Sequence, residues 1–194
     1  MNSSNTNSPT RSISKAFPTS VSLALQVAAL LLVGFTATWL HYRFRLPLNM
    51  PGRHGLEFML LVMAARYASN MKLSATITVS GSIAASLIPI LGFKDPMLPY
   101  IYLGIGAFID FAWYRWSNFR KWIPLAALLG GLAYGLIPLV RLLFMVIGSY
   151  PYNSFAKHGY IIPFLTHIGF GFTGALAGVG IISEVKKRIN KKTK

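Results

Sequence analysis

Six apolar runs, separated by short polar breaks, constrain the fold of this chain more than any other feature. They lie at about residues 21–40, 55–69, 73–92, 98–114, 122–148 and 159–183. Of the 194 residues, 54% are hydrophobic and only 12% are charged, whereas soluble domains are about 25% charged. A helix needs about 20 apolar residues to cross a bilayer. The sequence therefore predicts an all-α, polytopic integral membrane protein with a bundle of six transmembrane helices.

The two ends of the chain are polar. Residues 1–17 are rich in Ser, Asn and Thr and contain no apolar run, which predicts a disordered N-terminal tail. We expect the six-helix domain over residues 18–185 and a basic cytoplasmic tail over residues 186–194. The first run is longer than the roughly 7–15 apolar residues of a secretory signal, so we expect it to remain as the first helix.

Lysine and arginine determine the expected orientation. If the N-terminus is cytoplasmic, thirteen of the 19 Lys and Arg residues fall on the cytoplasmic side, five fall outside, and Arg141 lies within a run. Cytoplasmic loops carry an excess of these residues, so we expect a multi-pass protein of the cell membrane with both termini in the cytoplasm. The net charge of +15 would suggest nucleic acid as the partner of a soluble protein. Here the cations flank apolar runs, so membrane lipid is the expected partner and nucleic acid is not.

Three of the five cations expected outside lie in one stretch, residues 41–57, HYRFRLPLNMPGRHGLE. This stretch contains Arg43, Arg45 and Arg53, two histidines and Glu57. Its segment Pro51-Gly-Arg-His-Gly55 has two glycines, which allow a close approach of the backbone to other groups. A basic cluster on this side of the membrane indicates either a polar binding site or an anchoring loop whose arginines reach lipid headgroups.

Ionisable groups inside a membrane are candidates for function because they are costly to bury there. The helical rise of about 1.5 Å per residue places Arg141 and His167 roughly 10 and 12 Å below the outer surface, in the layer of Glu57. Asp110 falls deeper, apart from this group. We therefore expect Glu57 as the counter-charge of Arg141, and a site for a small molecule with an anionic or amide portion. Its residues would be Arg45, Arg53, His54, Glu57, Arg141 and His167.

Other chemistry has little support in the sequence. There is no cysteine, so disulfides and thiolate sites are excluded. No Walker motif or dinucleotide fingerprint occurs. The four histidines show no i, i+4 ligand spacing, and we predict no catalytic residue, metal ligand or cofactor. An intramembrane enzyme, a haem- or metal-binding protein that uses the outer histidines, and an accessory subunit without a ligand remain as alternatives.

Small residues recur at helical spacing within the runs. Examples are Ala24-x-x-x-Ala28, Ser82-x-x-x-Ser86, Gly131-x-x-x-Gly135 and the glycines at 171, 174, 178 and 180. Small residues let helix backbones approach closely in lipid. The pattern indicates tight packing inside one bundle, or docking onto another membrane subunit.

In architecture the chain resembles the substrate-binding membrane subunits, or S components, of energy-coupling factor transporters. The resemblance rests on the chain length, six runs, cytoplasmic ends, the long first outer loop and the Ala24-x-x-x-Ala28 pattern. It implies a protein that is not an enzyme and that captures a vitamin-like small molecule near the outer face. Ala24 and Ala28 would dock onto a transmembrane coupling subunit, and separate ATPases would supply the energy.

Overall fold

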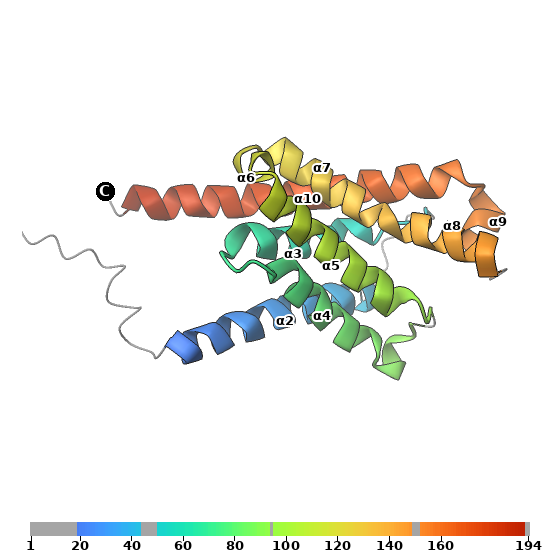
Figure 1. Cartoon of the computed structure of the whole chain (residues 1–194), viewed down its shortest axis with the longest axis horizontal. Coiled ribbons are helices and arrows are strands. Elements are labelled where there is room, and N and C mark those ends of the chain that lie inside the picture. Colours follow the sequence, from blue (N-terminus) through green and yellow to red (C-terminus); the bar gives the residue numbers. More distant parts are fainter. Residues whose placement is uncertain (1–18, 44–49, 94, 149–151, 193–194) are drawn as a thin grey trace, which may run out of the picture.

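Every regular element in the described part of the chain is a helix (Figure 1). The computed structural model describes residues 19–43, 50–93, 95–148 and 152–192. The all-α class expected from the sequence is therefore confirmed. The elements in chain order are α2 (Thr19–Arg43), α3 (Gly55–Ala68), α4 (Ser74–Ser86), the 3₁₀ turn η1 (Pro89–Leu91), α5 (Leu98–Arg115), α6 (Asn118–Lys121), α7 (Ile123–Tyr134), α8 (Leu136–Gly148), α9 (Asn153–His158) and α10 (Ile161–Lys192).

Three segments are long and apolar enough to cross a membrane. They are Val21–Arg43 in α2, Ile123–Gly148 across α7 and α8, and Ile161–Lys192 in α10. Helices α3 and α4 have only 14 and 13 residues, so each measures about 20 Å against a hydrocarbon core of about 30 Å. The run expected over residues 73–92 does not form one helix, because α4 ends at Ser86 and the 3₁₀ turn follows.

Helices α7 and α8 together replace the single helix expected over residues 122–148. The break falls at Gly135, three residues before Pro138, which is fully buried. Proline has no N–H to donate to the carbonyl four residues earlier, and its ring crowds that carbonyl. The interruption at Gly135 therefore follows from Pro138.

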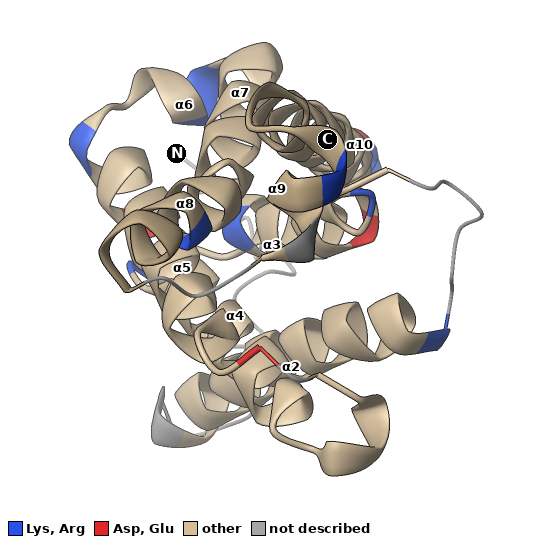
Figure 2. Cartoon of the chain, turned by 90° about the vertical axis from the view of Figure 1, so that its right-hand side faces the viewer, with Lys and Arg blue, Asp and Glu red and all other residues tan. Residues whose placement is uncertain are grey.

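Helix α3 lies at the centre of the bundle. It packs against α10, α2, α4 and α7, and Figure 2 shows it between α2 and α10. Its buried face carries the apolar side chains of Phe58, Met59, Val62 and Met63 and, in the last turn, Arg66. The other strong pairings are α10 with α7, α2 with α4, and α4 with α5.

Glycine and serine make the closest helix contacts. A Cβ on Gly174 or Gly178 would overlap the backbone carbonyl of Leu56 or Leu60, so these glycines let α10 lie directly on α3. Between α2 and α4, the Ser82 hydroxyl donates a hydrogen bond to the Gly34 carbonyl (2.7 Å). These small residues thus pack the bundle internally, which is one of the two roles expected for them.

The start of α2 and the end of α10 lie at the same end of the bundle (Figure 1). Residues 186–192, expected in a separate basic tail, continue α10 to Lys192. At this end Asp110 is buried and accepts hydrogen bonds from Arg66 (3.1 Å) and from the N–H groups of Ala75 and Thr76 (3.1 and 2.7 Å). Asp110 therefore joins α5 to the first turn of α4 and to α3, where its negative charge also favours the helix N-terminus.

Candidate functional site

A polar cavity of about 230 Å³ lies at the opposite end of the bundle, where the chain enters α3, α5 and α10. Each side chain comes from a different segment. They are His41 at the end of α2, His54 before α3, Asp95 before α5, Tyr102 on α5, Tyr134 on α7, Arg141 on α8 and His167 on α10. The cavity thus depends on the packing of the whole bundle.

Arg141 forms an ion pair across the cavity wall with Asp95. Its Nη2 and Nε atoms donate to Asp95 Oδ2 at 2.8 and 3.1 Å, and the guanidinium lies over the ring of Tyr152 at 5.4 Å. Asp95 Oδ1 accepts a hydrogen bond from the Met97 N–H (3.0 Å). The expectation that Glu57 is the counter-charge of Arg141 is therefore wrong, because the turn before α5 brings Asp95 beside α8.

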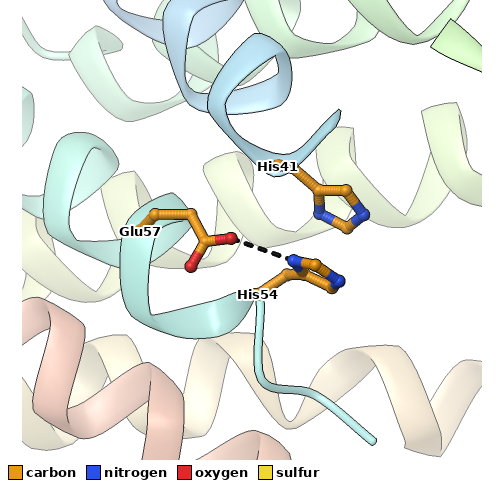
Figure 3. A group of neighbouring side chains, drawn as sticks. All are labelled: His41, His54 and Glu57. Carbon is orange, nitrogen blue, oxygen red and sulfur yellow. Dashed lines mark hydrogen bonds and ion pairs between the residues drawn. The ribbon is translucent and has the colours of Figure 1, made fainter. Parts of the chain in front are cut away.

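Glu57 instead pairs with His54, one turn earlier. The His54 Nδ1 and Glu57 Oε1 atoms are 2.9 Å apart (Figure 3), and Arg53 Nε donates to His54 Nε2 at 3.2 Å. These two contacts require the His54 tautomer with the proton on Nδ1, since Nε2 acts as acceptor. The other Glu57 oxygen, Oε2, is buried and has no hydrogen-bond partner among the described residues.

His41 extends this group from the last turn of α2. Its ring stacks on that of His54, with centroids 3.5 Å apart and an angle of 27° between the planes. The centroid of the Phe93 ring lies 5.2 Å from that of His41. Figure 3 shows His41 on one helix and His54 with Glu57 on another. Nitrogen or oxygen atoms of the three residues all lie within 4.8 Å of one another, so this group could hold a metal ion.

His167 is buried on α10 and forms the far wall of the cavity. Its Nδ1 lies 2.6 Å from the Pro163 carbonyl and must donate to it, since the carbonyl can only accept. Its ring stacks on Tyr134 with centroids 5.3 Å apart. This hydrogen bond and stacking fix the ring in place.

The glycines at 52 and 55 allow the loop before α3 to reach this wall. Gly52 has a positive φ of 77°, and a Cβ there would lie 2.6 Å from His167 Nδ1. A Cβ on Gly55 would overlap the ring of Tyr134. The close backbone approach predicted from the glycines of Pro51-Gly-Arg-His-Gly55 is therefore confirmed at both positions.

The structure thus gathers most of the residues proposed from the sequence. His54, Arg141 and His167 line one cavity. Glu57 is not among the residues that line it but is paired with His54. Arg53 lines an adjoining cavity of about 170 Å³ together with His41 and His54. Arg45 lies outside the described residues.

Sequence reasoning missed Asp95, Tyr102 and Tyr134, which also line the cavity. The sequence does contain features that single out these three residues. Asp95 is one of only four acidic residues, and it lies directly before Pro96 in the turn that leads into α5. The two tyrosines are polar-tipped rings within apolar runs, a position where the hydroxyl needs a partner or water.

Comparisons of this chain with protein-family models, with curated proteins and with solved structures find no match.

Proposed function

We propose that this protein spans the cell membrane and captures a small polar molecule from the non-cytoplasmic side in the cavity beside Arg141. The observation that carries the proposal is the cavity itself, which brings the Arg141–Asp95 ion pair together with the rings of His41, His54, Tyr102, Tyr134 and His167. It lies at the end of the bundle away from the basic end of α10.

The membrane arrangement is proposed as six crossings with both termini cytoplasmic. The three long candidate spans would be completed by α3, α4 and α5. Although α3 and α4 are short, α3 is surrounded by other helices. Non-helical backbone is tolerated at membrane depth where it lines a polar cavity, as the segments around Gly52 and Phe93 do. The excess of Lys and Arg at the opposite end supports this orientation.

The lining suggests which chemistry the captured molecule would have. Arg141 offers N–H donors for a carboxylate or amide oxygen, and Asp95 offers an acceptor for a ligand N–H. The aromatic rings would contact the faces of a flat ligand. Among the described lining residues there is no Ser, Thr or Cys that could act as a nucleophile beside a histidine.

A transport role would need a partner that supplies energy, since the sequence has no nucleotide-binding motif. As in the S components that the architecture resembles, we propose a transmembrane coupling subunit with ATPases. Ala24 and Ala28 are both exposed on α2, so the small-residue face proposed for docking is not covered by the rest of the bundle.

The test separates capture from docking. Cells that lack their own copy of the gene would express wild-type protein, Ala24→Trp or Leu23→Trp, and uptake of the molecule that co-purifies with the wild type would be measured. We expect Ala24→Trp to abolish uptake while the purified variant still holds the molecule. Leu23→Trp is the matched control, because Leu23 is 52% exposed on the same helix and lies about 100° around the helix from Ala24, off the Ala24–Ala28 face. Equal uptake by all three proteins, or loss of the bound molecule from Ala24→Trp, would contradict the proposal.

A second candidate function, metal binding, is favoured by the cluster of His41, His54 and Glu57. Glu57 accepts the Nδ1 proton of His54, and a carboxylate in this position is the usual support of a histidine ligand. A metal ion would then bind His54 Nε2 in place of the Arg53 N–H. Calorimetric titration of chelator-treated protein with Zn²⁺ tests it. Binding that disappears in His41→Gln and persists in His158→Gln would support a site here, whereas identical titrations of the two variants would exclude it.

A further inference from the structure

A second polar cavity lies at the basic end of the bundle, between the ends of α3, α5, α6 and α10. Its volume is about 230 Å³, and its polar lining includes Arg66, Asn70, Arg120 and Lys186. Helix α3 runs from Gly55, beside the first cavity, to Ala68, a length of about 20 Å. No carboxylate is found among the described residues that line this second cavity.

Arg66 forms the base of the cavity and is only 6% exposed. Its Nη1 carries two N–H groups. They are shared among Asp110 Oδ1 (3.1 Å), the Met71 and Lys72 carbonyls (2.5 and 3.2 Å) and the Ser74 hydroxyl (2.5 Å), which all lie within hydrogen-bond distance of Nη1. The ring of Trp113 lies 5.4 Å from the guanidinium carbon. Nε, in contrast, is buried without a hydrogen-bond acceptor among the described residues.

Two exposed cations form the rim. Lys186 on α10 is held in place because its Nζ donates to the Tyr67 carbonyl (2.6 Å) and lies 4.8 Å from the centre of the Tyr67 ring. Arg120 comes from α6 on the other side. Within the described part of the chain, neither forms an ion pair with a carboxylate.

The acids at this end are already engaged. Asp110 is bound by Arg66, and Glu184 pairs with Lys187 at 2.6 Å. The Arg66–Asp110 pair contributes no net charge, so the positive potential at the mouth comes from Arg120 and Lys186. The cavity therefore combines two cations at its rim with the buried guanidinium of Arg66 at its base.

We propose that this second cavity binds a phosphate-type oxyanion, supplied by the headgroup of an anionic phospholipid in the cytoplasmic leaflet. Arginine and lysine are the residues that recognise phosphate, arginine by directed N–H donors and lysine as a point charge. Basic pockets between transmembrane helices on the cytoplasmic side suit anionic headgroups. Free phosphate offers the same chemistry, so the experiment includes both sources.

The test measures lipid retention by the full-length protein. Protein reconstituted in nanodiscs of phosphatidylcholine with a minor fraction of phosphatidylglycerol would be analysed by native mass spectrometry for the lipids that stay bound. We expect the double variant Arg120→Gln/Lys186→Gln to retain phosphatidylglycerol about tenfold more weakly, the effect of losing one charge-assisted hydrogen bond. Lys121→Gln/Lys191→Gln removes the same charge from exposed positions outside the cavity and should retain it as the wild type does.

A second arm adds inorganic phosphate to the same samples. If phosphate displaces no lipid, the phospholipid is the source, and if it displaces phosphatidylglycerol, the oxyanion site stands with free phosphate as its ligand. Equal losses of phosphatidylglycerol retention in both double variants would show a diffuse charge effect and would overturn the proposal. Equal retention of phosphatidylglycerol and phosphatidylcholine by the wild type would also overturn it. None of these results bears on the first cavity, because it lies at the other end of the bundle.

Discussion

Arg141 and Asp95 hold together two segments that are 46 residues apart in the chain. The ion pair is partly buried, with the two side chains 23% and 17% exposed, and Asp95 also accepts the Met97 N–H at the start of α5. The pair therefore fixes the entrance of α5 against α8, and it places one guanidinium and one carboxylate at the wall of the cavity.

Asp95→Asn tests this structural role. The change removes the charge that balances Arg141 and weakens a charge-assisted hydrogen bond, so we expect a loss of roughly 1.5–3 kcal/mol in unfolding free energy. The measurement is the thermal unfolding midpoint in detergent. Glu184→Gln is the control, since Glu184 forms an exposed pair with Lys187 and should leave the midpoint unchanged. An unchanged midpoint in Asp95→Asn would show that the pair does not hold α5 to α8.

At the scale of single residues, the sequence predicted features that depend on local backbone geometry. The glycines at 52 and 55 could be assigned to a close approach because only glycine lacks the Cβ that would clash. The partner of Arg141 could not be assigned in the same way. It depends on which loop lies beside α8, and depth along each helix does not determine which helices are neighbours.

Helix α10 owes its position on α3 to glycines at i and i+4. Gly174 and Gly178 face the carbonyls of Leu56 and Leu60, whereas Gly180 has open space around it. The spacing alone did not distinguish these positions, since all of these glycines belong to one small-residue pattern. Contact with a second backbone is what makes a glycine necessary.

Gly178→Ala and Gly180→Ala form a matched pair of variants. The added methyl group at Gly178 would force α10 away from α3, and overpacking of this kind costs roughly 1–3 kcal/mol. At Gly180 the added methyl group would have no atom within 4 Å. Replacing a glycine in a helix interior by alanine then stabilises the protein by up to about 1 kcal/mol. We expect opposite shifts of the unfolding midpoint. Equal shifts would contradict the packing of α10 on α3.

The bounds of α2 and the start of α10 were predictable to within a few residues, because each follows from a long uninterrupted apolar run. The end of α10 was not, since the helix continues through the basic residues to Lys192. The run over residues 73–92 looked continuous by hydropathy, but Pro89 favours an extended residue before it, and Ile88 is extended with ψ of 116°. Hydropathy measures apolar character and does not register where the backbone must leave the helix.

At the scale of the whole molecule, the chain has two polar ends separated by the apolar middle of the bundle. One end carries the cavity beside Arg141, and the other carries the cations of α6 and of the end of α10. The count of cations on each side of the apolar runs anticipated this division. Which side chains would meet in a cavity followed only from the packing of the bundle.

The absence of cysteine makes the orientation directly testable with single introduced thiols. Met50 is exposed and lies two residues before Gly52, which lines the first cavity, and Asn190 is exposed near the end of α10. With the cavity facing outward, a membrane-impermeant maleimide should label Met50→Cys on intact cells and Asn190→Cys only after permeabilisation. The reverse pattern would invert the orientation and place the cavity in the cytoplasm.

Binding of a small molecule in the cavity beside Arg141 can be detected by mass spectrometry of the compounds released from freshly purified protein. We expect a compound that is stoichiometric with the wild type, strongly depleted in Arg141→Gln, and retained in Arg188→Gln, which removes one arginine charge near the end of α10. Release of the same compounds in the same amounts from all three proteins would contradict binding in this cavity.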